Sequence, residues 1–327
     1  MTTTKIGRSI DRVDVHAHFV PGFYAEALKA AGHARPDGMP AIPEWNAVDA
    51  LKTMDMLGVR AAVLSISSPG VHFGDDAAAR ALARRVNEEA AMLRRKHSHR
   101  FGSFATLPLP DIDGAVAEAI HALDTLGADG VVLESNHDGV YLGDPRLELL
   151  YRELDRRRAV IFIHPTSPAC SCCPRLQARY PRPMLEFMFE TTRSVTDMVV
   201  AGVLQRYPGL RVIVPHAGAV LPALVNRIEL MSPMLRTSTG ESAPSMREAL
   251  RQLHFDLAGA PVPNLLRELL EVADASKLHY GSDYPFTPAT ACDFLLKQLE
   301  TTSLLDEVSR EAIFGKNSLE LLPRMRS

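Results

Sequence analysis

The first chemically informative stretch of the chain is DVHAHF, which begins at Asp14 and contains His16 and His18. It ends an apolar run, as expected of a β-strand. Residues two apart on a strand point to the same face, separated by about 6.6 Å of rise. Two imidazoles in this arrangement can lean together and share one cation, at roughly 2.0–2.1 Å per bond for zinc. The spacing therefore predicts half of a metal site, which needs further ligands from elsewhere in the chain.

Three later motifs offer those ligands, each at the end of another apolar run. His164 is followed by Pro165, His216 lies in PHAG, and Asp283 lies in GSDYP. His164 and Asp283 can complete the coordination sphere, whereas His216 can be either a further ligand or a base beside the metal. Imidazole and carboxylate ligands favour Zn²⁺, with Mn²⁺ or Fe²⁺ as alternatives. One such motif alone is weak, but all of them at equivalent strand ends predict a divalent metal site.

The segments that position these residues alternate between apolar, β-branched runs and amphipathic stretches. A parallel sheet covered on both faces needs such continuous apolar strands. The predicted strands are Val13–Val15, Ala61–Ile66, Phe101–Leu107, Gly130–Leu133, Ala159–Ile163, Arg211–Val214, Leu253–Leu257 and Leu278–Tyr280. Apolar residues recur at helical spacing between them. The predicted helices are Asp76–Arg95, Gly114–Leu126, Leu147–Arg157, Thr192–Tyr207, Leu221–Met231 and Asn264–Ala273.

This alternation predicts an α/β fold, a (β/α)8 TIM-type barrel with its chemistry at the carboxyl ends of the strands. A doubly wound open sheet is the alternative, which the missing GxGxxG motif after the first strand disfavours. We interpret residues 1–327 as a single domain, because Pro and Gly do not cluster into a linker. Long insertions near 21–45 and 165–190 would shape a pocket at the barrel mouth. The second contains Cys170, Cys172 and Cys173, whose spacing matches no common zinc pattern and favours a loop.

The composition is that of a globular chain, with 46% hydrophobic and 23% charged residues. A net charge of −3 without a long block of one sign gives no reason to expect nucleic acid or a membrane surface as partner. No signal peptide is visible, and no apolar run approaches the roughly 20 residues of a membrane helix. Four cysteines in a chain of this length do not form a disulfide framework, so we expect a cytoplasmic protein.

The motif set resembles the amidohydrolase superfamily, in particular its amidohydrolase-related decarboxylase branch. The resemblance runs from DVHAHF to GSDYPF and includes SSPGVHFGD, HPTSP, FETTRSVTDMVVAGVLQRYPGLRVIVPHAGAVLPALVNRI and FGKNSLELL. The branch contains the aminocarboxymuconate-semialdehyde, resorcylate and 6-methylsalicylate decarboxylases, and the chain is most similar to the last of these groups. The resemblance implies a metal-dependent hydrolase fold and a carboxy-lyase that releases CO2 from a small hydroxylated aromatic acid.

By this resemblance, His16, His18, His164 and Asp283 are the metal ligands, and His216 is the catalytic histidine. Two departures from the wider superfamily refine the expectation. Hydrolase branches often have a carboxylated lysine at the end of the fourth strand, where this chain has the sequence VLES, so we expect one metal ion rather than two. Resorcylate-type enzymes have a glutamate just before the first histidine motif, whereas the DV of this chain is closer to the aminocarboxymuconate type.

The expected reaction needs a proton on the ring carbon that bears the carboxylate, and an ortho hydroxyl supplies the electron density. One divalent metal could hold the carboxylate and phenolate oxygens as Lewis acid and template. Asp283, poised by His216, would deliver the proton. The alternative is a hydrolase on the same scaffold, in which His216 deprotonates a metal-bound water that attacks a lactone or an amide. The ligand set alone does not separate these two reactions.

The substrate pocket is predicted from side chains near the strand ends, with ordinary packing as the alternative for each. The candidates are Phe19, Trp45, His72, Phe187, Tyr284 and Phe286. Arg227, in the motif LVNRI, matches an arginine that binds the substrate carboxylate across a dimer interface in the resembling decarboxylases. A guanidinium suits this role because it pairs with a carboxylate bidentately, although a helix-surface salt bridge is the alternative. If Arg227 acts in trans, the protein is at least a homodimer.

Overall fold

The computed structural model describes residues 11–169, 179–237 and 239–326. Eight parallel strands lie in the order β1-β2-β3-β4-β7-β8-β9-β10. Their bounds are Arg12–His18 (β1), Val59–Ser65 (β2), Phe101–Thr106 (β3), Gly130–Glu134 (β4), Val160–His164 (β7), Arg211–Val214 (β8), His254–Asp256 (β9) and Leu278–His279 (β10). The ring closes between β10 and β1, where Val15 N donates to Tyr280 O at 3.0 Å. The predicted barrel is confirmed in preference to an open sheet.

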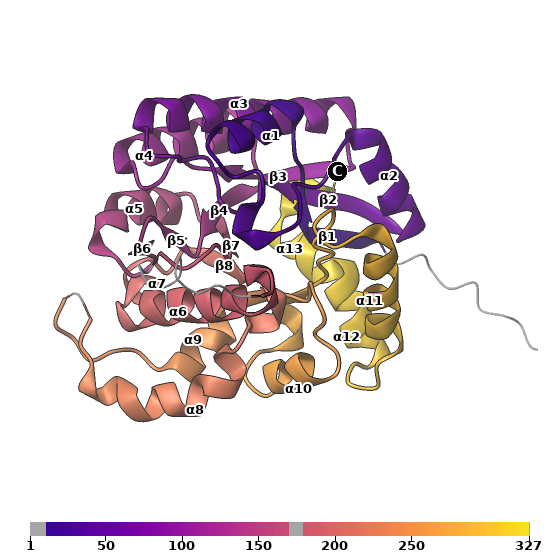
Figure 1. Ribbon diagram of the computed structural model, residues 1–327. Helices are drawn as coiled ribbons and strands as arrows, with labels where there is room; N and C mark the ends of the chain where they lie inside the picture. The colour runs from indigo at the N-terminus through magenta and orange to yellow at the C-terminus, as the bar shows by residue number, and fades with distance from the viewer. Residues whose placement is uncertain (1–10, 170–178, 238, 327) are drawn as a thin grey trace, which may run out of the picture.

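Helices surround the barrel on its outside (Figure 1). Their bounds are Gly22–Ala30 (α1), Ala47–Met56 (α2), Asp76–Lys96 (α3), Ile112–His121 (α4), Glu148–Arg156 (α5), Glu186–Val200 (α6), Val203–Arg206 (α7), Leu221–Met231 (α8), Met246–Gln252 (α9), Asn264–Leu270 (α10), Ala289–Thr301 (α11), Glu307–Glu311 (α12) and Asn317–Leu321 (α13). A small hairpin, Asn136–His137 (β5) and Val140–Tyr141 (β6), follows β4. The insertion near 21–45 contains α1, whereas Cys170, Cys172 and Cys173 in the other insertion lie outside the described residues.

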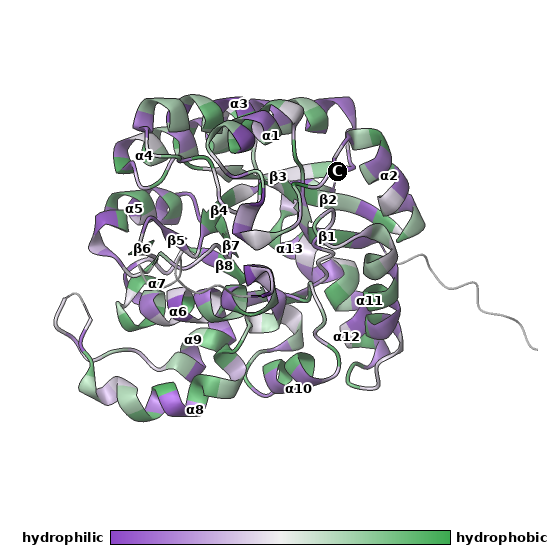
Figure 2. Ribbon diagram, viewed as in Figure 1, coloured by the Kyte–Doolittle hydropathy of each residue, from purple (hydrophilic) through white to green (hydrophobic). Residues whose placement is uncertain are grey.

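The outer helices are amphipathic, as Figure 2 shows by the alternation of hydrophobic and hydrophilic residues along α3 and α8. In α3 the buried positions Ala79, Ala83, Val86 and Ala90 recur at helical spacing, and the Asp75 side chain caps the first turn by accepting from Ala78 N. Among the described residues, no helix combines the length and the apolar character needed to cross a membrane.

The inside of the barrel is filled by side chains from alternate strand positions. Val15, Val63 and Phe162 are completely buried there. The C-terminal residues Leu322 and Met325 pack into the same cluster, at the amino ends of the strands, where Arg211, the first residue of β8, donates to Leu321 O at 3.2 Å. Each buried side chain of this size contributes about 1.5–3 kcal/mol relative to exposure. One end of the barrel is thereby closed by packing, which leaves the carboxyl ends of the strands for a site.

The predicted helix over residues 192–207 differs from the structure. Helix α6 begins earlier, at Glu186, and ends at Val200, and the short helix α7 follows. The break lies at Gly202, whose φ of 76° is in the left-handed region that favours glycine. A Cβ at this position would lie 2.9 Å from Thr237 Cγ2, so any other residue would also force the Thr237 side chain to shift.

Candidate metal centre and active site

His16 and His18 lie at the carboxyl end of β1, and their rings point into the barrel. Both residues are 0% exposed. Because strand side chains alternate between faces, Ala17 between them turns toward the helices instead. The two Nε2 atoms lie 3.1 Å apart, with the ring planes nearly perpendicular at 87°. The backbone of one strand therefore delivers two imidazole nitrogens to one point.

His164 and Asp283 complete this group from the opposite wall and from the segment after β10. The ring of His164, the last residue of β7, lies 4.8 Å from that of His18 between centroids. Asp283 Oδ1 lies 3.5 Å from His16 Nε2 and 3.2 Å from His18 Nε2. One ligand atom from each of the four residues lies within 4.8 Å of all the others. The structure thus brings together the residues that the sequence motifs nominate as ligands.

The hydrogen bonds behind the two β1 histidines show what this group is suited to hold. His16 Nδ1 lies 2.9 Å from the carboxylate of Asp256, and His18 Nδ1 lies 3.3 Å from the carbonyl oxygen and 3.1 Å from the hydroxyl oxygen of Ser65. The carboxylate and the carbonyl oxygen can only accept, and the Ser65 hydroxyl can accept as well, so the arrangement favours the tautomers in which both Nδ1 atoms carry the proton and both Nε2 atoms present a lone pair. Two lone pairs and a carboxylate oxygen facing one another repel unless a cation lies between them. The donor set therefore fits a divalent metal ion.

Burial and charge act in different directions on the protonation of these groups. Burial lowers the pKa of His18 and of His164, because an imidazolium is poorly solvated inside the barrel. At His16 burial acts in the same sense, but the carboxylates of Asp256 and Asp283 outweigh it and raise the pKa to about 9. Burial also opposes the charged form of Asp283, yet the hydrogen bond with His18 holds the pKa of this carboxyl below its usual range. The negative charge gathered around His16 attracts either a proton or a metal ion, which compete for the same nitrogen.

Asp256, the last residue of β9, is a site residue that the sequence interpretation missed. Its side chain is completely buried and accepts from the backbone N–H groups of His216 and Ala258 at 3.0 and 2.9 Å, in addition to its bond with His16. A carboxylate behind a metal-ligating histidine fixes the ring and its tautomer. Asp256 lies at the carboxyl end of a correctly predicted strand, so reading this strand end together with the four that carry the motifs would have found it.

His216 follows β8 and lies beside the ligand group. Its ring centroid is 5.1 Å from that of His16. Its φ of 54° is in the left-handed region, which is rare outside glycine and is held here by the bond from His216 N to Asp256. Within the described part of the chain, the buried Nδ1 atom has no hydrogen-bond partner. His216 thus lies beside the ligands, and its Nδ1 atom is not used by a hydrogen bond to another described residue.

The aromatic candidates divide into two groups. Phe286 and Phe187 touch the centre, with ring centroids 5.4 Å from His18 and 6.2 Å from His164 respectively. Phe19 is buried in the core against Trp45, at 5.9 Å between centroids. Trp45 and Tyr284 line a cavity of only about 20 Å³ behind His18. Phe286 and Phe187 are therefore better placed than the other aromatic residues to contact a planar ring bound at the ligands.

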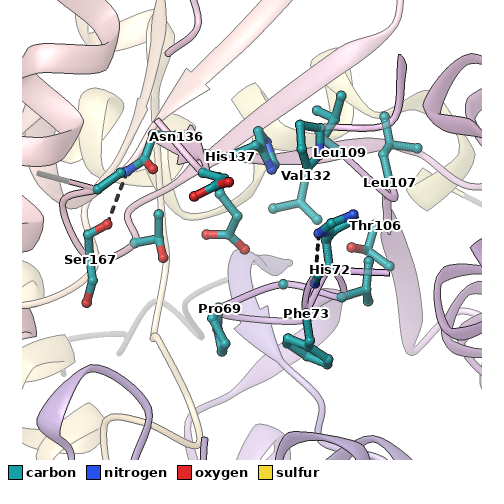
Figure 3. A pocket seen from close by; sticks show the side chains of 18 residues that line it. Pro69, His72, Phe73, Thr106, Leu107, Leu109, Val132, Asn136, His137 and Ser167 are labelled. Carbon is teal, nitrogen blue, oxygen red and sulfur yellow. Dashed lines mark hydrogen bonds between the residues drawn. The ribbon is translucent and has the colours of Figure 1, made fainter. Parts of the chain in front are cut away.

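The two remaining candidates lie away from the ligand group. His72 lines a cavity of about 390 Å³ beside the centre, but its Nε2 faces Asp76 at 2.8 Å and its Nδ1 accepts from Gly74 N (Figure 3). Arg227 is exposed on α8 and is not brought to the site of its own chain. Within the described residues, Arg227 makes no hydrogen bond or ion pair with the ligand group.

Comparison with known proteins agrees with this geometry. The chain belongs to the amidohydrolase family, whose model matches residues 13–324. It is 35% identical to the 6-methylsalicylic acid decarboxylase of Penicillium expansum, over 96% of this chain and 97% of that protein. It is also 35% identical to the decarboxylase yanB of Aspergillus niger, over 97% of this chain and 89% of that protein.

Solved structures share the fold over nearly the whole chain. An amidohydrolase II is 35% identical, with a TM-score of 0.89 over 95% of this chain and 99% of that chain. A 2,6-dihydroxybenzoate decarboxylase in complex with 2,6-dihydroxybenzoate has a TM-score of 0.81 at 23% identity, over 95% and 99% of the two chains. A dihydroxybenzoic acid decarboxylase from Polaromonas, with bound manganese, has a TM-score of 0.82 at 20% identity, over 97% and 98%. For the two decarboxylases, which are 23% and 20% identical, the similarity is one of fold.

Proposed function

We propose that this protein is a carboxy-lyase that removes CO2, without oxidation, from a small hydroxylated aromatic acid of the 6-methylsalicylate type. One observation carries the proposal. Three imidazoles and one carboxylate from distant parts of the sequence face one another at the barrel mouth. They do so in a chain that is 35% identical, over almost its full length, to a 6-methylsalicylic acid decarboxylase.

His16, His18, His164 and Asp283 hold one divalent ion in this proposal. Three imidazoles with one carboxylate suit Zn²⁺, and Mn²⁺ is the alternative. When bound, the ion supplies a Lewis acid for the carboxylate and phenolate oxygens of the substrate. Phe286 and Phe187, whose rings lie beside His18 and His164, would pack against the substrate ring, whereas Phe19, Trp45 and Tyr284 support β1 from behind.

The protein's own contribution to the reaction is a proton and the groups that hold it. Asp283 delivers the proton to the ring carbon that bears the carboxylate, from Oδ2, the oxygen that accepts from Thr287 at 3.3 Å. As the bond to the carboxylate breaks, CO2 leaves, and the retained proton completes the new C–H bond. The imidazole of His216, which lies beside the ligand group, exchanges a proton with the carboxyl group of Asp283. Its Nδ1 atom, which has no partner among the described residues, is available for that exchange.

We further propose that the functional unit is a homodimer in which Arg227 of one copy binds the substrate carboxylate at the site of the other. The exposure of Arg227 on α8 is compatible with such a contact. The planar guanidinium would pair bidentately with a carboxylate.

Turnover of 6-methylsalicylate by protein loaded with Zn²⁺ or Mn²⁺ tests the proposed reaction. The expected result is equal release of CO2 and 3-methylphenol, abolished by a chelator and restored by one of the two ions. The two metal arms also show which ion supports turnover. Absence of gas across a panel of salicylates, while lactones or amides are consumed, would instead establish the hydrolase alternative.

A further inference from the structure

Another cavity, of about 250 Å³, lies at the end of the barrel opposite the metal centre. Its lining includes Ala159, directly before β7, and Arg211, the first residue of β8. The proposed ligand His164 is the last residue of β7, so the length of that strand, roughly 16 Å, separates the cavity from the ligand group. A small molecule bound in this cavity would therefore not reach the ligands.

The lining of this cavity carries an excess of positive charge. Its charged side chains are four arginines and two aspartates, namely Arg157, Arg158, Arg211, Arg324, Asp124 and Asp129. Asp124 accepts two hydrogen bonds from Arg157, at 2.6 and 3.1 Å. Asp129 already pairs with Arg94, which lies outside the lining, at 3.1 Å. The lining therefore has two more positive than negative charges, and both of its carboxylates have cationic partners.

The guanidinium group of Arg211 is bound to main-chain oxygens only, within the part of the chain that the structure describes. It donates to Arg158 O at 2.9 Å and to Leu321 O at 3.2 Å. Burial lowers the pKa of Arg211, and the neighbouring charge of Arg158 lowers it further, because both disfavour a cation at this position. A partly buried cation without a counter-ion is costly, so a bound anion would stabilise it.

The side chain of Arg158 is exposed at the edge of the same cavity, just after the end of α5. It makes no hydrogen bond or ion pair to another described residue. The segments outside the described ranges contain no Asp or Glu, so they offer no acidic side chain as its partner. Two neighbouring guanidinium groups, those of Arg158 and Arg211, thus face one cavity without a carboxylate between them.

We propose that this cavity binds a small phosphomonoester, with the guanidinium groups of Arg158 and Arg211 on its phosphate. A phosphomonoester carries about 1.5 to 2 negative charges at neutral pH, which matches the excess charge of the lining, and its oxygens pair bidentately with a guanidinium. The carbon part of the ligand packs against the apolar lining residues Leu123, Leu321 and Leu322. Because pockets for drug-sized ligands have roughly 300–1,000 Å³, a cavity of about 250 Å³ favours a small ester.

Calorimetric titration of the metal-loaded protein, at constant ionic strength, tests the proposal with glycerol 3-phosphate, inorganic phosphate and glycerate. The wild type should bind glycerol 3-phosphate most tightly, since inorganic phosphate lacks the carbon part and glycerate carries a single charge. Arg158→Ala should weaken this binding by about tenfold or more, the effect of losing one hydrogen bond between charged groups. Arg152→Ala is the matched control, because Arg152 is also exposed, on α5, but does not line the cavity. It should leave the dissociation constant nearly unchanged.

Absence of saturable binding of either phosphate compound, or tightest binding of glycerate, would overturn the proposal. An Arg158→Ala protein that binds glycerol 3-phosphate as tightly as the wild type would also overturn it, because the anion would then lie elsewhere, for example at the metal. Tighter binding of inorganic phosphate than of the ester would replace the ester by free phosphate as the ligand. Arg324→Gln removes a lining charge from the C-terminal segment and repeats the test if Arg158→Ala does not fold.

This site does not depend on the proposed reaction. Arg158→Ala should release CO2 at the wild-type rate when no phosphate compound is present, because the cavity and the ligand group lie at opposite ends of β7. A protein that binds the ester but releases no CO2 from any salicylate would preserve the phosphate site and refute the decarboxylase proposal. The two failures are therefore distinguishable.

Discussion

Replacing Asp256 by asparagine tests whether the carboxylate behind His16 organises the metal centre. One oxygen of Asp256 faces His16 Nδ1 at 2.9 Å, and the other accepts from the backbone N–H groups of His216 and Ala258. An asparagine keeps the size of the side chain but turns one of these oxygens into an NH₂ group. In either orientation of the amide, its NH₂ group faces another donor, which is either the protonated His16 Nδ1 or the backbone N–H groups of His216 and Ala258.

The two orientations of the amide have different consequences for the centre. If the NH₂ group faces His16 Nδ1, that nitrogen must accept, so the ring proton moves to Nε2 and blocks the atom that faces the other ligands. If it faces the backbone instead, two hydrogen bonds that hold the His216 segment are lost. Loss of such an outer partner typically weakens metal binding by 10- to 100-fold, or about 1.4–2.7 kcal/mol. We expect Asp256→Asn to lie in that range.

The assay is competition for Zn²⁺ or Mn²⁺ against a chromophoric chelator, with unfolding by urea measured on the same samples. Asp129→Asn is the matched control, because Asp129 is also buried but bonds Ser103 N and Arg94 outside the ligand group. It should lose stability and keep the metal dissociation constant. A folded Asp256→Asn protein that binds metal as tightly as the wild type would refute the reasoning.

Three further predictions follow from the same geometry. His216→Asn should retain metal but lose turnover by about 10²- to 10⁴-fold, as measured by CO2 release; a wild-type rate would remove His216 from the mechanism. Mixing Arg227→Ala protein with the His216→Asn protein should restore activity if Arg227 acts across subunits, whereas no rescue in verified mixed dimers would refute that role. Burial lowers the pKa of His279 to about 3 and that of its partner His254 as well, so both stay neutral when folded and take up protons when unfolded below about pH 6.5. The free energy of unfolding, measured in urea, should therefore fall as the pH decreases, by up to roughly 1.4 kcal/mol per pH unit for each histidine. A His254→Gln, His279→Gln double variant whose free energy of unfolding has the same pH dependence as the wild type would contradict this.

The sequence predicted the elements whose pattern is local. Several strands of the barrel were recognisable as near-continuous apolar runs, such as AAVLSI and AVIFIH, because both of their faces are buried. Helix α8 was predicted with its observed bounds, Leu221–Met231, since its apolar spacing and its flanking residues agree. The break after α6 was not predicted, because Gly202, whose φ of 76° ends the helix, lies within a continuous apolar pattern, and a glycine there is also tolerated inside a helix.

The nominated ligands were predictable for a related reason. A closed parallel barrel brings all carboxyl strand ends to one mouth, so residues at those ends meet whatever their separation along the chain. The polar groups behind and beside them were not predicted. Glu134 lies at a strand end too, but a carboxyl group there has many ordinary roles, and only the approach of its Oε2 to His164 Nδ1, at 3.4 Å, distinguishes it. The position of Arg227 away from the centre likewise depends on the path of α8, which no local pattern encodes.

The backbone conformations of His216 and Asp283 connect the groups proposed to transfer the proton to the residues that orient the ligands. His216 and Asp283 both have φ values in the left-handed region, 54° and 59°, which cost free energy for residues with a Cβ. Each is held by one hydrogen bond to a group of the ligand network: His216 N donates to Asp256, and Asp283 N donates to His16 O at 2.7 Å. The residues that orient the β1 imidazoles therefore also hold the two groups proposed to move the proton. A perturbation of Asp256 or His16 should consequently weaken metal binding and displace the proton-transfer groups together, because one buried network carries both.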